Sequence, residues 1–125
     1  MSDIRATTIS ALNGTDPITL TKQSAAKVWV NFNGAAFGER DSFNISSLTD
    51  RGTGLYTLNY TSNMGNANYS STGSGADFAD DADGRNRMVT PTTLTASASY
   101  ANTFTTDGGA TDLALVCVSI HGDLA

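Results

Sequence analysis

The chain has 125 residues, which is enough for one domain with its own hydrophobic core, and only 15% of the residues are charged. The net charge of −5 argues against a nucleic-acid partner and against binding to an anionic membrane surface. Most of the remaining polar positions are Ser, Thr, Asn or Gly, and this composition favours strands and turns, so we expect an all-β fold.

Residues 1–24 alternate only weakly between apolar and polar positions and contain a turn signal at Asn13–Pro17. We interpret this segment as an N-terminal arm or docking segment, and residues 25–125 as the folded domain. The first residues lack the apolar core of a signal peptide, and no run of about 18 apolar residues occurs in the chain. We therefore expect a soluble protein that is made in the cytosol.

The clearest strand is Lys27–Gly34, with the sequence KVWVNFNG. Because successive side chains of a strand point to opposite faces, one face of this strand carries a purely apolar set and is expected to be buried: Ala26, Val28, Val30 and Phe32. Trp29 lies on the other face, where we expect it to cover a sheet edge or a neighbouring chain.

A second strand-like run, Asp41–Asp50, is expected to place Phe43 and Ile45 together. After the turn-rich segment Asp50–Gly54, a third run separates two faces, one with Leu55, Thr57 and Asn59 and the other with Tyr56, Leu58 and Tyr60. The short connections fit hairpins and a meander.

Residues 61–87 form the longest loop-like region, with a short strand expected around Asn68–Thr72. Alternation resumes at Met88–Val89 and from Thr92 to Phe104, then pauses at a predicted turn over residues 107–112. The last run, LALVCVSI over residues 113–120, is apolar on both faces, so we expect a covered, central strand. Cys117, the single cysteine, has no partner for an intrachain disulfide and is expected to be a small core residue.

The acidic stretch before Gly84 is the only segment that suggests a metal site, because closely spaced carboxylates on a loop suit calcium. Its candidate ligands are Asp80, Asp81 and Asp83, preceded by Asp77. The spacing does not match an EF-hand loop, since Ala79 stands at the first ligand position and Thr90 where a bidentate Glu belongs. We therefore favour a solvated loop without a metal.

No pattern of side chains argues for catalysis. His121, the only histidine, lies two residues from Ser119 on one predicted strand, and this spacing does not indicate a triad. We interpret it as a structural polar residue at a strand end. Phe37 and Phe78 stand among small or polar residues in predicted loops, where they are candidates to anchor a partner subunit or a ligand. We expect no enzymatic activity and no cofactor.

The strand segments together resemble a β-domain that recurs in tail fibres and other virion appendages of bacteriophages, especially marine ones. They are KVWVNFNG at Lys27–Gly34, DSFNISSLTD at Asp41–Asp50, GTGLYTLNY at Gly52–Tyr60 and NANYS at Asn66–Ser70, with the flanking ITLTKQSAAK and VSIHGDLA. The resemblance implies a virion structural protein, usually trimeric and often at the host-facing end of a fibre, and it supplies no catalytic residues. The loop Thr72–Arg87 is longer and more acidic than the family leads us to expect. No shaft or coiled coil precedes the domain, so we expect a short fibre or tip docked on another virion protein, or a decoration protein seated on the capsid.

We predict an antiparallel β-sandwich of jelly-roll-like type with about eight strands that assembles as a homotrimer in the virion, after synthesis in the host cytoplasm. The predicted function is host attachment as a tail-fibre or receptor-binding protein, with residues 1–24 docking on other virion proteins and the loops contacting a host surface glycan or protein. The loop candidates for this contact are Arg40, Arg51, Phe78, Arg85 and Arg87. The alternative is a capsid decoration protein, such as a cement or head-fibre protein, that stabilises the phage head; a free carbohydrate-binding module is a third, less favoured possibility.

Overall fold

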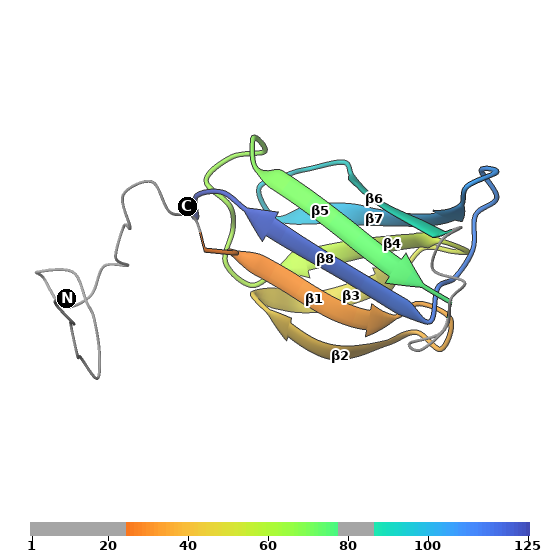
Figure 1. The fold of residues 1–125 in the computed structure, drawn as a ribbon. Helices are drawn as coiled ribbons and strands as arrows, with labels where there is room; N and C mark the ends of the chain where they lie inside the picture. Colours follow the sequence, from red (N-terminus) through yellow and green to blue (C-terminus); the bar gives the residue numbers. More distant parts are fainter. Residues whose placement is uncertain (1–24, 78–86) are drawn as a thin grey trace, which may run out of the picture.

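A computed structural model describes residues 25–77 and 87–125, which form a sandwich of eight antiparallel strands in two four-stranded sheets (Figure 1). Sheet A has the strand order β2-β1-β8-β5, with β1 (Val28–Asn33), β2 (Gly38–Phe43), β5 (Ser70–Ala76) and β8 (Leu115–His121). Sheet B has the order β3-β4-β7-β6, with β3 (Ile45–Asp50), β4 (Leu55–Tyr60), β6 (Arg87–Thr92) and β7 (Ala98–Thr105). The predicted all-β sandwich is confirmed, and no helix in the described part of the chain is long and apolar enough to cross a membrane.

The order of the strands combines hairpins with crossings between the sheets. The first strand, β1, pairs with the last, β8, as the first and last strands of a jelly roll do. The hairpins β1–β2, β3–β4 and β6–β7 each stay within one sheet, whereas the other connections pass from one sheet to the other. The long-range pairing of β1 with β8 places the first and the last strand side by side in the centre of sheet A.

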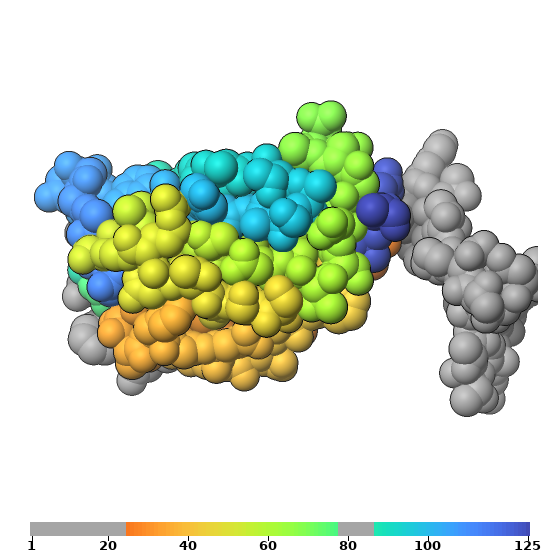
Figure 2. All heavy atoms as spheres, turned by 180° about the vertical axis from the view of Figure 1, so that it is seen from behind, coloured from red at the N-terminus to blue at the C-terminus, as the bar shows by residue number. Residues whose placement is uncertain are grey.

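Because the strands alternate in direction, the connections divide between two ends of the sandwich. One end, called here the terminal end, holds residue 25, the C-terminus and the connections at residues 44, 61–69 and 93–97. There Lys27 N donates a hydrogen bond to Ile120 O at 2.8 Å, and Ala125 N donates one to Asn63 O at 2.9 Å. The opposite end, called the loop end, holds the connections at 34–37, 51–54 and 106–114 and the strand ends beside residues 78–86. Figure 2 shows the C-terminus and the protruding β7–β8 connection at opposite ends.

The core lies between the sheets and consists of alternate residues of the central strands. The buried side chains of β1, β4 and β8 are Val28, Val30 and Phe32, then Tyr56, Leu58 and Tyr60, then Val116, Val118 and Ile120. Phe32 and Tyr56 meet edge to face across the sandwich, with ring centroids 5.0 Å apart. The predicted division of β1 and β4 into two faces is therefore confirmed, with Val28, Val30 and Phe32 buried on β1 and Ala26 only partly buried before it, since the period of two is a local property of each strand.

Two close approaches complete the sandwich. At the β5–β6 side, a Cβ atom on Gly73 would lie 2.6 Å from Val89 Cγ1, so glycine allows β5 to approach β6. At the terminal end, the Tyr69 hydroxyl lies 2.9 Å from the Tyr60 hydroxyl, 3.0 Å from Thr95 O and 3.2 Å from Ala98 O. These bonds join the β4–β5 and β6–β7 connections, and burial raises the pKa of Tyr60 far above its usual value.

The prediction of one strand over Asp41–Asp50 is wrong, because Asn44 divides this run between the two sheets. Asn44 has a left-handed φ of 61°, and its side chain donates hydrogen bonds to Lys27 O at 3.1 Å and to Ser62 O at 3.0 Å. An amide side chain that bonds to nearby backbone makes such a φ tolerable for asparagine. Phe43 therefore stays on sheet A, where it is 52% exposed, while Ile45 packs against the core from sheet B.

Two further predictions change in detail. The short strand expected at Asn68–Thr72 begins at Ser70 and continues to Ala76. The last strand is central in sheet A, as predicted, but residues 25–77 and 87–125 do not cover its second face: Cys117 lies half-buried on the outer face and is not a core residue. The predicted core position of Cys117 is wrong because Val116, Val118 and Ile120 occupy the inner face of β8, and the side chains between them must then point outward.

Candidate binding surfaces

The outer face of sheet A brings together side chains that are distant in the sequence. Strand pairing places Trp29 opposite Phe43 on one side and opposite Ser119 on the other, and Ser119 in turn lies opposite Thr72. One step along the strands, Cys117 lies between Asn31 and Ser74. The side chains at these positions of β1, β2, β5 and β8 point away from the core, and we call this surface the A face: Trp29, Asn31, Phe43, Thr72, Ser74, Cys117 and Ser119.

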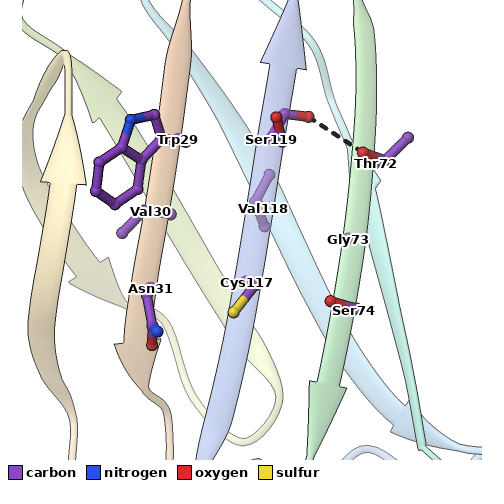
Figure 3. A pocket seen from close by; sticks show the side chains of 9 residues that line it. All are labelled: Trp29, Val30, Asn31, Thr72, Gly73, Ser74, Cys117, Val118 and Ser119. Carbon is purple, nitrogen blue, oxygen red and sulfur yellow. Dashed lines mark hydrogen bonds between the residues drawn. The ribbon is translucent and has the colours of Figure 1, made fainter. Parts of the chain in front are cut away.

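A hollow of about 530 Å³ opens on the A face (Figure 3). It is lined by side chains of β1, β5 and β8 and by the backbone between them: Trp29, Val30, Asn31, Thr72, Gly73, Ser74, Cys117, Val118 and Ser119. The hollow forms because the outward side chains of β5 and β8 are much smaller than the indole of Trp29: Thr72, Ser74, Cys117 and Ser119. Trp29 is 36% exposed, so its ring remains accessible to solvent and to a ligand.

The polar groups of the hollow are neutral and only partly engaged. Asn31 Oδ1 accepts a hydrogen bond from Arg40 Nη1 at 3.2 Å, and Thr72 Oγ1 donates a long one to Ser119 O at 3.5 Å. Burial raises the pKa of the Cys117 thiol, against an opposing effect of the positive charge on Arg40. The thiol is therefore uncharged near neutral pH, and the lining carries no formal charge.

The described arginines predicted to contact a host bind other groups of the same domain, and Arg40 and Arg87 lie on β2 and β6, not in loops as predicted. Arg40 Nη2 donates to Ala114 O at 2.7 Å, Arg51 stacks over the Tyr100 ring at 4.1 Å, and Arg87 forms an ion pair with Asp77 in which Arg87 Nε lies 2.6 Å from Asp77 Oδ2. These contacts join β2 to the β7–β8 connection, the β3–β4 turn to β7, and the end of β5 to β6. The role of the three arginines in host contact stays a prediction.

Other predicted residues divide between described and undescribed positions. Phe37 is 38% exposed at the loop end and stacks on Tyr56, with ring centroids 6.2 Å apart and an interplanar angle of 7°. Phe37 is thus partly engaged inside the domain and partly available to a partner. The candidates Phe78, Arg85, Asp80, Asp81 and Asp83 lie outside the described residues.

Asp112 is a structural residue of the loop end that sequence reasoning did not identify. Its Oδ1 accepts hydrogen bonds from Gly54 N and from the Tyr56 hydroxyl, both at 2.7 Å. Burial, together with the Asp112 carboxylate, raises the pKa of Tyr56 far above its usual value. An aspartate in a Gly-rich segment signals a turn, and nothing local shows that its partners are about half the chain away.

Neither a metal centre nor a catalytic assembly can be assigned to residues 25–77 and 87–125. Within these ranges, no group of three or more His, Cys, Asp or Glu side chains is placed to hold a metal ion. Ser119 Oγ and His121 Nε2 are 3.3 Å apart at the exposed end of β8, where the sequence predicted a structural histidine, and we assign this pair no catalytic role. No protein-family model, curated protein or solved structure was found to match the chain.

Proposed function

We propose that this chain is a non-enzymatic structural protein of a bacteriophage virion, of the tail-fibre or receptor-binding type, that acts as a homotrimeric host-attachment module. The proposal starts from the strand segments that resemble the phage appendage domain. The structural observation that carries it is the polarity of the sandwich: residue 25 and the C-terminus share the terminal end, and the odd-to-even connections share the loop end.

This polarity suits a module that is held at one end. A partner attached through residues 1–24 would hold the terminal end, and the loop end and the sides of the sandwich would face outward. Antiparallel sheets with many inter-strand hydrogen bonds give a rigid platform on which exposed groups keep their spacing. We therefore assign docking on other virion proteins to residues 1–24 and host contact to the outward surfaces of the sandwich.

The homotrimer is supported by an apolar patch on the outer face of sheet B near the loop end. Met88 is 44% exposed and pairs across the strands with Phe104, and Leu55, on the same outer face, is 37% exposed. Exposed apolar patches often mark subunit contacts, and three copies would multiply weak individual contacts with a host surface. A trimer is expected to have three times the chain mass of 13.0 kDa in light scattering after size-exclusion chromatography.

The location of the protein on virions tests this function. Virions are purified from a lysate in which mass spectrometry detects the chain, and are labelled with gold-conjugated antibody raised against the purified protein. Label at fibres or at the tail tip is the expected result, and antibody preadsorbed with excess purified chain serves as the control. Label over the head would replace host attachment by capsid decoration, and the absence of label would refute the assignment to the virion.

A further inference from the structure

We infer that the hollow on the A face is a binding site for a neutral saccharide, with Trp29 as the stacking surface and the surrounding hydroxyl and amide groups as hydrogen-bond partners. The site names a ligand class for the host attachment proposed above, and it rests on that function for its biological role. It places ligand recognition on a sheet face, whereas the sequence predicted host contact through the loops.

The first argument is the exposure of the indole. Trp29 is a large aromatic side chain that stays 36% exposed on the rigid central strand β1, at the wall of a hollow. The C–H groups on one face of a pyranose ring carry partial positive charge and pack well against the electron-rich face of an aromatic ring. Because β1 is hydrogen-bonded on both sides, by β2 and by β8, this stacking surface is already fixed before a ligand arrives.

The second argument is the hydrogen-bonding capacity beside the ring. Asn31 uses Oδ1 to accept from Arg40, which fixes the amide and leaves its two N–H donors for a ligand. Ser74, on β5, makes no side-chain hydrogen bond to any residue in the described ranges, and the bond from Thr72 to Ser119 O is long enough to be exchanged readily. Amides and hydroxyls of this kind both donate and accept, as recognition of sugar hydroxyls requires.

The third argument concerns charge and size. The lining contains no ionised side chain at neutral pH, and the nearby guanidinium of Arg40 is engaged by Asn31 Oδ1 and Ala114 O, so a neutral ligand is favoured over a phosphate, a carboxylate or an ammonium group. The volume of about 530 Å³ falls within the range of small-molecule sites, about 300–1,000 Å³. The hollow is open to solvent, which suits a sugar unit that belongs to a longer chain.

The single tryptophan provides a direct test of binding. Because Trp29 is the only tryptophan of the chain, fluorescence excited at the red edge of the absorption band, where the four tyrosines do not absorb, reports on the surroundings of this indole. The protein is titrated with methyl glycosides of glucose, galactose, mannose and N-acetylglucosamine and with their common neutral disaccharides. We expect at least one of these sugars to shift the emission saturably to shorter wavelength, at millimolar concentration or below. No shift with any neutral sugar, and no sugar signal in saturation-transfer NMR, would overturn the inference.

Three variants locate the site. Ser74→Leu fills the hollow while leaving Trp29 as the reporter, and it is expected to weaken sugar binding by about tenfold or more. Trp29→Ala, followed by NMR, is expected to abolish binding. The matched control is Phe43→Ala, because Phe43 is an exposed aromatic residue on the same face, directly opposite Trp29, but does not line the hollow. Circular dichroism checks that each variant is folded.

The pattern of affinities decides between this site and another. Unchanged affinity in Ser74→Leu, or an equal loss in Phe43→Ala and Trp29→Ala, would place the sugar outside the hollow and refute the inference. Failure of this site and failure of the proposed function are distinguishable. Gold label on tail fibres without sugar binding would remove the site alone, whereas sugar binding by a protein that is absent from virions would support the site and remove the virion function.

Discussion

Asp112 is expected to be one of the most sensitive positions of the loop end, and we predict that Asp112→Ala destabilises the domain substantially. Its carboxylate joins the β7–β8 connection to the β3–β4 turn through Gly54 N and the Tyr56 hydroxyl. Both partners are buried, and Gly54 is held further by the bond from Thr103 N to Gly54 O at 2.8 Å. The variant therefore leaves two buried donors without their acceptor.

The magnitude follows from these two bonds. A hydrogen bond to a charged acceptor contributes about 1.5–3 kcal/mol, but Asp112 itself is exposed and water replaces part of each bond, so we expect a loss of about 2–3 kcal/mol in total. For a domain of this size the loss corresponds to a decrease of Tm by about 10–20 °C. Urea unfolding monitored by circular dichroism measures the free energy, and a thermal scan measures Tm.

Two comparisons separate the predicted cause from a general effect of the loop. Asp107→Ala changes another aspartate of the same connection, whose side chain bonds locally to the Thr105 hydroxyl, and should cost less than about 1 kcal/mol. A double-mutant cycle of Asp112→Ala with Tyr56→Phe should give a coupling energy of about 1 kcal/mol or more. A coupling energy near zero, or equal losses for the two aspartates, would show that the bonds at Asp112 do not carry the stability of this end.

Three other substitutions or measurements test the packing and the thiol. Gly73→Ala should lower the free energy of unfolding in urea by about 1–3 kcal/mol, because the new Cβ meets Val89. The control Gly38→Ala should leave this free energy nearly unchanged, because its new Cβ meets no atom within 4 Å. Equal effects would contradict the close approach of β5 and β6. Tyr69→Phe removes a hydroxyl within hydrogen-bond distance of three partners at the terminal end and should cost about 1–2 kcal/mol, and an unchanged urea midpoint would argue against this junction. Burial raises the pKa of Cys117, so its alkylation by iodoacetamide should require a higher pH in the folded chain than in urea. The raised pKa should also stabilise the fold below the unfolded pKa of the thiol, and this contribution should be lost as the pH rises through the folded pKa. Identical pH profiles of alkylation in the folded chain and in urea would refute this.

The strand faces could be predicted because they depend on local alternation. Val28, Val30 and Phe32 repeat with a period of two, and burial of this set requires only that one face of β1 meets a core. The same holds for Tyr56 and Leu58 on β4. A central position for β8 also follows from its composition, since a strand with large apolar residues is best placed between two neighbours.

The break at Asn44 could not be predicted from local pattern. The run from Asp41 to Asp50 keeps a strand-like composition, and the residue that ends pairing with β1 is stabilised by bonds to Lys27 O and Ser62 O, which lie in other segments. The hollow was missed for the same reason. The outward position of Trp29 was predictable, but its closeness to Thr72 and Ser119 depends on the register of β1, β5 and β8, which no single segment encodes.

The distribution of occupied and available polar groups explains why we assign recognition to the sheet face. At the loop end, Arg40, Arg51 and Arg87 each have a partner within the domain, and a ligand that used one of them would first have to replace that contact. On the A face, the Ser74 hydroxyl and the Asn31 amide nitrogen make no hydrogen bond to another described residue, so a ligand can bond to them without breaking a contact of the domain. The arginines thus stabilise the geometry of the loop end, and the neutral face beside Trp29 retains the capacity to bind.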